Sequence, residues 1–110
     1  MGQMAVRDSN TNPLDQIRLR SNSWLARLAA KKLKTGSVAL VIGRTIHLFN
    51  ITPDEFYQSP RLIRHELKHV EQYRRLGLFR FLALYGWYSL KYGYYNNPLE
   101  VEAREAENEN

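Results

Sequence analysis

The chain has 110 residues, of which 44% are hydrophobic and 25% are charged, and it contains no cysteine. This length fits one domain rather than two, and the apolar fraction excludes a wholly disordered chain. The lack of cysteine excludes disulfides and leaves His, Asp, Glu or water as ligands of any metal ion. The net charge of +5 is not gathered in one run, so we do not expect a nucleic-acid partner.

The chain begins with a polar segment that predicts little fixed structure. We expect residues 1–12 to be a flexible lead, residues 13–107 to form the domain and residues 108–110 to fray. Ser23 can cap a helix that runs from Trp24 to about Lys34, because apolar residues recur there at helical spacing.

Two β-rich runs follow, at residues 38–42 and 45–49. The Gly-Arg pair between them suits a type II′ turn, so we predict a β-hairpin. His47 falls in the second run, where we expect a half-buried strand position. Residues 52–55 read Thr-Pro-Asp-Glu, which is typical of a capping box with proline at the first helical position, and they predict a short helix.

Three further helices are predicted in the second half of the chain. The longest starts at Pro60 and ends at Gly77, an aromatic-rich helix covers Leu78 to about Tyr92, and the last starts at Pro98. The apolar stretch at residues 78–90 contains an arginine and is too short to span a bilayer. The N-terminus lacks the pattern of a signal peptide, so we expect a cytoplasmic protein.

The long helix contains the sequence His-Glu-Leu-Lys-His at residues 65–69. Histidines four residues apart lie on the same side of a helix, so the rings of His65 and His69 can reach one ion. Glu66 lies about 100° further round, close enough to take a proton from a water molecule on that ion. A bound zinc ion would lower the pKa of this water from ~15.7 toward ~7.

The helical wheel favours a metal over a purely structural role for these residues. An apolar arc of about 180° contains His69 and Glu66, and His65 lies at its edge. A carboxylate and two imidazoles on a core face are costly unless something compensates them, and an ion does so directly. The alternative is a pair of hydrogen-bonded core histidines with Glu66 paired to one of them.

A catalytic zinc site also needs a third protein ligand. A third histidine six residues after His69 is absent, because Arg75 stands there. Glu100 and Glu102 flank the apolar stripe of the last helix on its two sides, and periodicity alone does not choose between them. Glu100 could also close a capping box with Asn97.

These motifs resemble the glutamate-type zincins, or gluzincins. The resemblance lies in residues 65–72, which fit a His-Glu-Leu-x-His-Val-x-Gln helix, and in the Glu-x-x-Ala stretch of Glu100 and Ala103. It implies Glu100 as the third zinc ligand, with Glu102 as the runner-up. It also implies an α+β zincin-like domain in which a small sheet packs on the active-site helix, with residues 45–49 as the edge strand that could pair with an extended peptide.

One position departs from the gluzincin pattern. Many gluzincins carry an aspartate four residues after the glutamate ligand, where it orients the first histidine, and here that residue is Arg104. Such outer carboxylates are typically worth ~10–100-fold in metal affinity or activity. Either another group takes over this role, with Glu55, Glu102 and Glu105 as candidates, or the site is weak, which would affect activity more than metal binding.

We therefore predict a zinc-dependent metallopeptidase-type hydrolase in which Glu66 activates a zinc-bound water against a peptide or amide carbonyl. The alternative is an inactive, zinc-stabilised interaction module. We expect a peptide or protein substrate. The aromatic helix could touch a membrane surface, although packing in the core or against a partner subunit is the favoured role. Tyr73 is assigned to core packing, and the donor to a developing oxyanion stays unassigned.

Overall fold

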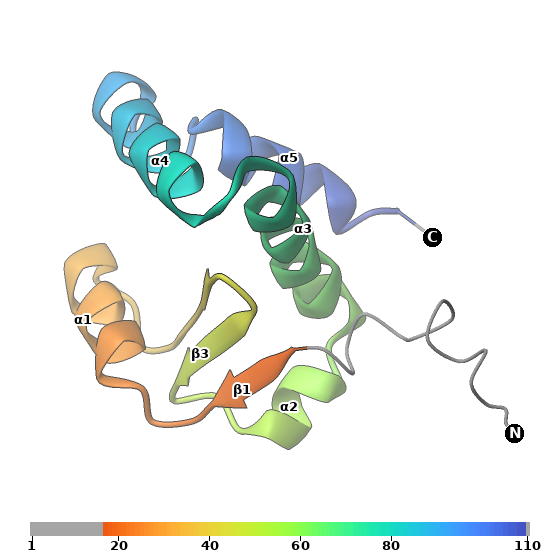
Figure 1. Cartoon of the computed structure of the whole chain (residues 1–110). Coiled ribbons are helices and arrows are strands. Elements are labelled where there is room, and N and C mark those ends of the chain that lie inside the picture. Colours follow the sequence, from red (N-terminus) through yellow and green to blue (C-terminus); the bar gives the residue numbers. More distant parts are fainter. Residues whose placement is uncertain (1–16, 110) are drawn as a thin grey trace, which may run out of the picture.

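A computed structural model describes residues 17–109 of the chain, and it confirms the α+β class (Figure 1). The predicted flexible lead at residues 1–12 lies outside the described residues. The elements in chain order are β1 (Arg18–Arg20), α1 (Trp24–Leu33), β2 (Val38–Ile42), β3 (Thr45–Phe49), α2 (Pro53–Tyr57), α3 (Pro60–Leu76), α4 (Leu78–Tyr92) and α5 (Pro98–Ala106).

The predicted hairpin is present with both strand boundaries as expected. β2 and β3 pair antiparallel from Val38 opposite Phe49 to Ile42 opposite Thr45, and Gly43 takes the positive φ of 65° that the tight turn requires. Side chains alternate between two faces. Ile46 and Leu48 are fully buried on the side that packs with α3, whereas Phe49 joins a smaller cluster under α1.

The sheet has a third strand that the sequence pattern did not predict. β1 pairs parallel with β3, so the strand order is β1-β3-β2 and β3 lies in the centre. The prediction that residues 45–49 form an edge strand is therefore wrong, and within residues 17–109 the outer strands are β1 and β2. Residues 18–20 read Arg-Leu-Arg, and so short a run with one apolar residue carries no strand signal by itself.

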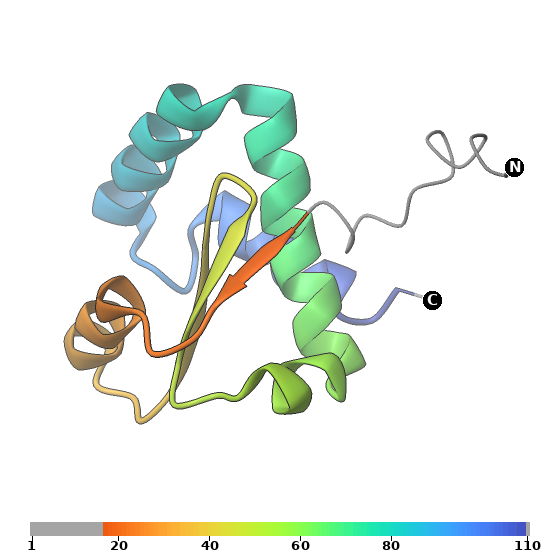
Figure 2. The ribbon, with the colours of Figure 1, turned by 60° about the horizontal axis from the view of Figure 1, so that its bottom comes forward.

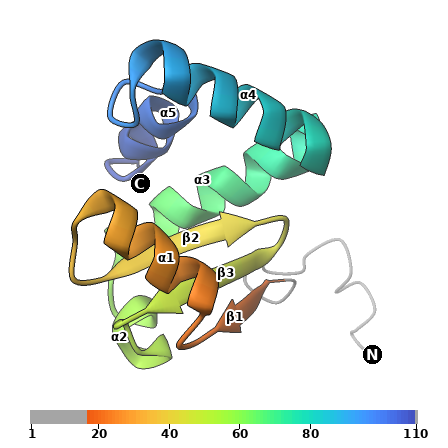
Figure 3. The same ribbon diagram turned by 90° about the vertical axis from the view of Figure 1, so that its left-hand side faces the viewer.

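The helices cover both faces of the sheet (Figures 2 and 3). α1 lies on one face, where Ala26 and Ala30 allow a close approach to Val38. Ser23 caps α1 as predicted, and its hydroxyl also bonds to Nδ1 of His47 at 2.8 Å. His47 is thus a buried, hydrogen-bonded strand residue. The capping box predicted at Thr52 and Glu55 is also present.

α3 lies on the other face of the sheet, and α4 and α5 follow it. Gly77 and Gly93 have φ values of 86° and 83°, a left-handed region that glycine adopts without a Cβ penalty, and each marks a change of helix direction. Asn97 is fully buried and joins α4 to α5: its Oδ1 accepts from Leu99 N, while its Nδ2 donates to Tyr85 O and to Ser89 Oγ. This contact fixes the angle at which α5 meets α3.

Among residues 17–109, no helix is both long enough and apolar enough to cross a membrane.

Candidate metal centre

Three side chains from two helices meet at one point beside α3. Nε2 of His65 and Nε2 of His69 lie 3.1 and 3.2 Å from the same oxygen, Oε1 of Glu100 on α5. One ligand atom from each residue lies within 4.8 Å of the others, so the group could hold a metal ion. The structure thus brings together the histidine pair and the first glutamate of the later helix.

The placement follows from helix geometry and from the packing of α5 on α3. The four-residue spacing stacks the two imidazoles on one side of α3, with ring centroids 5.1 Å apart. Glu100 lies in the first turn of α5, which Asn97 anchors to α4. His69 and Glu100 are buried, whereas His65 is partly exposed.

The other ring nitrogens are held by acceptors. Nδ1–H of His65 donates to Oε2 of Glu107 at 2.7 Å. The Nε2 amide of Gln72 donates to Leu99 O and to Glu102 Oε1, so its Oε1 must be the acceptor that faces Nδ1 of His69, at 2.9 Å. Both Nδ1 atoms therefore carry a proton, and in the neutral rings both Nε2 lone pairs point at Glu100.

These lone pairs and the Glu100 carboxylate form a donor set that could hold a cation. Burial alone would lower the pKa of each histidine, but hydrogen bonds to Glu100, and to Glu107 for His65, outweigh it and raise both pKa values. Burial would likewise raise the pKa of Glu100, yet its bonds to the two histidines lower it below the usual range. Protons and a divalent ion would therefore compete for the same Nε2 atoms.

Glu66 is the one buried carboxylate here without a full set of partners. It is 3% exposed, and its Oε1 has no hydrogen-bond partner among the described residues. Burial is the main reason that its pKa is raised to about 8; the positive charge of His69 opposes the shift, and the carboxylates of Glu100 and Glu107 add to it. An oxygen that is both buried and unpaired is costly as part of a carboxylate, and a proton or an enclosed water molecule would relieve that cost.

A tyrosine from α4 completes the contacts of Glu100. The hydroxyl of Tyr85 donates to Glu100 Oε2 at 2.5 Å, which leaves Oε1 for the two histidines. The ring of Tyr85 stacks on Phe81, and Phe81 stacks in turn on Tyr73 with centroids 3.7 Å apart. Tyr73 is buried, which agrees with its predicted core role, and the aromatic stack supports the position of Tyr85.

A family model, that of the eCIS core domain (extracellular contractile injection system core), matches residues 3–77. The chain belongs to this family. Comparisons with curated proteins and with solved structures find no match. Membership of the eCIS core domain family is compatible with a zincin-like fold. The matched range includes the helix that carries His65, Glu66 and His69 and ends where α4 begins, so Tyr85 and Glu100 lie outside it.

The runner-up ligand lies apart from this group in the eCIS core domain. The Glu102 side chain is 41% exposed and contacts Gln72 at 2.6 Å and Arg75 at 3.6 Å. It lies two residues after Glu100 on α5, so its side chain points about 200° round the helix from that of Glu100, which faces the histidines. It supports Gln72, which in turn orients His69.

The carboxylate that orients His65 is none of the three that we had considered. Arg104 binds Tyr95 O at 2.6 Å, Glu55 caps α2, and Glu107 takes the place beside His65. Helical periodicity could have found it, because seven residues are nearly two turns and bring Glu107 back to the side of Glu100. Glu107 was not among the candidates because it is the last residue of the predicted domain, next to residues 108–110 that we expected to fray. The carbonyl of Glu107 accepts two bonds from Arg64, at 3.0 and 2.7 Å, which hold this end in place.

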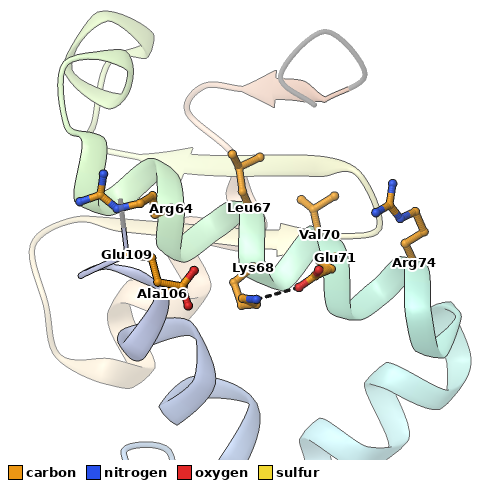
Figure 4. A pocket seen from close by; sticks show the side chains of 8 residues that line it. All are labelled: Arg64, Leu67, Lys68, Val70, Glu71, Arg74, Ala106 and Glu109. Atoms are coloured by element: carbon orange, nitrogen blue, oxygen red, sulfur yellow. Dashed lines mark hydrogen bonds and ion pairs between the residues drawn. The ribbon is translucent and has the colours of Figure 1, made fainter. Parts of the chain in front are cut away.

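A hollow of about 300 Å³ lies on a different side of α3 (Figure 4). Leu67 and Glu71, about 200° and 240° round the helix from His65, contribute to its lining. None of the three candidate ligands lines it, and its Lys68 is paired with Glu71 at 2.8 Å. The hollow is therefore separate from the candidate metal centre.

Proposed function

We propose that this eCIS core domain is a zinc-dependent hydrolase that acts on peptide or amide bonds. The observation that carries the proposal is the convergence of two imidazole Nε2 atoms and one carboxylate oxygen, with both Nδ1–H groups held by Glu107 and Gln72.

The donor set fits zinc better than it fits a hard cation. Two imidazoles and one carboxylate are the ligands of several catalytic zinc sites, and three protein ligands leave a fourth position open. The resemblance of residues 65–72 to the gluzincin helix supports the same choice. When bound, zinc supplies a Lewis acid that polarises a carbonyl and lowers the pKa of a water molecule toward ~7.

Glu66 is the residue that would move the proton. Its carboxylate would accept the proton of the attacking water, and the resulting acid could deliver that proton to the leaving amine. Burial raises the pKa of Glu66 to about 8 in the metal-free protein, and the charge of a bound zinc ion would lower that pKa again, so that the ionised carboxylate could act as the base near neutral pH.

A tyrosine is the proposed donor to the developing oxyanion. The hydroxyl of Tyr85 is occupied by Glu100, and we propose Tyr94, in the turn after α4, because the charges of Glu100 and Glu66 both act on its hydroxyl. Burial, followed by the charges of Glu100 and Glu66, raises the pKa of Tyr94 to about 12, so its phenol stays protonated at neutral pH. An extended peptide would pair with the free edge of β2, which packs next to α3.

The test combines metal analysis with a peptide-library cleavage assay on the purified chain. We expect about one zinc per chain; Glu66→Gln should keep the zinc and lose cleavage, and Tyr94→Phe should lower kcat with unchanged zinc content. Glu71→Gln is the matched control, since Glu71 is an exposed glutamate on the same helix. A parent protein that binds no zinc after reconstitution would refute the proposal.

The second candidate function is a zinc-stabilised module without turnover. Its main support was Arg104 in place of the orienting aspartate, and the contact between Glu107 and His65 removes that argument. The two functions differ in one result. In a module without turnover, the parent protein binds zinc but cleaves no peptide, so Glu66→Gln has no activity to abolish.

A further inference from the structure

α4 exposes more apolar surface than a helix at the periphery of a small domain normally does. Phe81 is its one buried residue, whereas Phe79 is 83%, Leu90 86% and Trp87 58% exposed. Figures 1 and 3 show α4 along the outside of the molecule. The sequence favoured packing for these side chains, but the described part of the chain provides no cover for them. A patch of this kind marks an interaction site.

The exposed residues form one continuous face. At about 100° per residue, Leu82, Phe79, Leu90 and Trp87 fall within an arc of about 140° that also includes Gly86. Arg80 and Lys91 lie next to each other at one border of this arc. The opposite side of the helix carries Phe81, Tyr85 and Tyr88, which pack toward the core. We call the exposed arc the outer face of α4.

The charged residues of α4 and of the chain immediately before and after it are all basic. No aspartate or glutamate occurs from Gln72 to Leu99, a range that contains Arg74, Arg75, Arg80 and Lys91. α1 continues this pattern: it exposes Trp24 and Leu28, carries three cations and no acidic residue, and lies on the same side of α3 as α4 (Figures 1 and 2). Basic residues at the border of an aromatic and aliphatic face are the pattern of helices that lie on anionic bilayers.

We propose that the outer face of α4 docks on an anionic lipid surface. Exposed leucines such as Leu82 and Leu90 suit acyl chains and offer a nucleic acid nothing to bond. In an antiparallel pair of α4 helices, a second copy of the chain would bring Arg80 and Lys91 against the same cations of its partner, at a cost in repulsion. The helix lies in the interface and does not span the membrane, in agreement with its length and hydropathy.

Co-sedimentation of the full chain with lipid vesicles tests the proposal. Binding is expected to vesicles of phosphatidylcholine and phosphatidylglycerol in equal parts, to weaken at high salt, and to be much weaker with phosphatidylcholine alone. Phe79→Glu with Leu90→Glu should lower the affinity at least about tenfold, since each apolar side chain loses its burial. Removal of Arg80 or Lys91 should cost about fivefold each.

Matched controls test whether binding depends on the outer face of α4 or on the charge and hydrophobicity of the protein as a whole. Tyr57→Glu changes an exposed aromatic on α2, at the other end of the molecule from α4, and Arg44→Ala removes an exposed cation from the hairpin turn; both should bind like the parent. In Trp24→Phe, Trp87 is the one remaining tryptophan, and its fluorescence should shift to the blue on anionic vesicles.

Three results would overturn the proposal. The first is no binding by the parent protein at low salt, and the second is full binding by the Phe79→Glu, Leu90→Glu variant with a native circular dichroism spectrum. The third is a dimer, seen by sedimentation velocity, that the double variant abolishes while vesicles bind neither protein. None of these depends on zinc, so the proposed hydrolase function is judged separately.

Discussion

Replacing Glu107 by alanine would remove the acceptor that holds Nδ1–H of His65. The carboxylate lies 2.7 Å from this nitrogen, and its side chain is 24% exposed. A hydrogen bond to a charged group contributes about 1.5–3 kcal/mol. If that free energy is lost from the zinc-bound state, the zinc affinity falls by about 10–100-fold. The pair of Glu107 with Arg61, 3.6 Å apart and with Arg61 mostly exposed, adds little.

The measurement is a competition titration of zinc against a chromophoric chelator, with the tautomer of His65 followed by nitrogen NMR. Glu105→Ala is the matched control, because it removes the same charge from an exposed position two residues away. Glu107→Ala should lose affinity and show a mixture of tautomers at His65, and Glu105→Ala should do neither. Equal zinc affinities for the two variants would refute the argument that Glu107 orients His65.

The other predictions concern protonation and helix capping. In the metal-free protein, burial raises the pKa of Glu66 to about 8, against 4.5 for an unperturbed glutamate. Between these two pH values the folded protein keeps a proton that the unfolded chain releases. The free energy of unfolding therefore falls as the pH rises from about 4.5 to about 8. Metal-free Glu66→Gln should therefore be more stable than the parent at pH 7, by about 1–3 kcal/mol in urea unfolding; a less stable variant would contradict this. Zinc affinity should decrease as the pH is lowered through the raised pKa values of His65 and His69, by about tenfold per pH unit for each proton displaced, and a pH-independent chelator competition would count against it. Asn97→Ala should cost about 2–3 kcal/mol, because it removes a helix cap and leaves the carbonyl of Tyr85 without its side-chain donor; a loss below about 0.5 kcal/mol would show that α5 is anchored otherwise.

Local signals in the sequence were sufficient for most of the fold. The hairpin, the capping box at Thr52 and the helix that carries His65 and His69 each rest on neighbouring residues, and each has the predicted bounds. β1 was missed because three residues that read Arg-Leu-Arg form a strand only when β3 is there to pair with them. The same omission led to the wrong edge strand.

The candidate centre was predictable where helix periodicity placed side chains together. Periodicity set His65, Glu66 and His69 on one side of α3, but it could not choose between Glu100 and Glu102, since that choice depends on how α5 is rotated against α3. The rotation is set by Asn97 through bonds to α4, which no local pattern reveals. The contacts of Glu107 and Tyr85 depend on the same long-range packing.

The ligands lie on both sides of α4 in the chain, 35 residues apart from His65 to Glu100. An ion held by α3 and α5 would therefore act as a crosslink that closes a loop around the whole of α4. A covalent link across such a loop lowers the entropy of the unfolded chain by the equivalent of about 4 kcal/mol, and a tightly held ion approaches that limit. Removal of the ion should then loosen α4 and α5 first, and proteases should cut near Gly93 while the sheet and α1 stay protected.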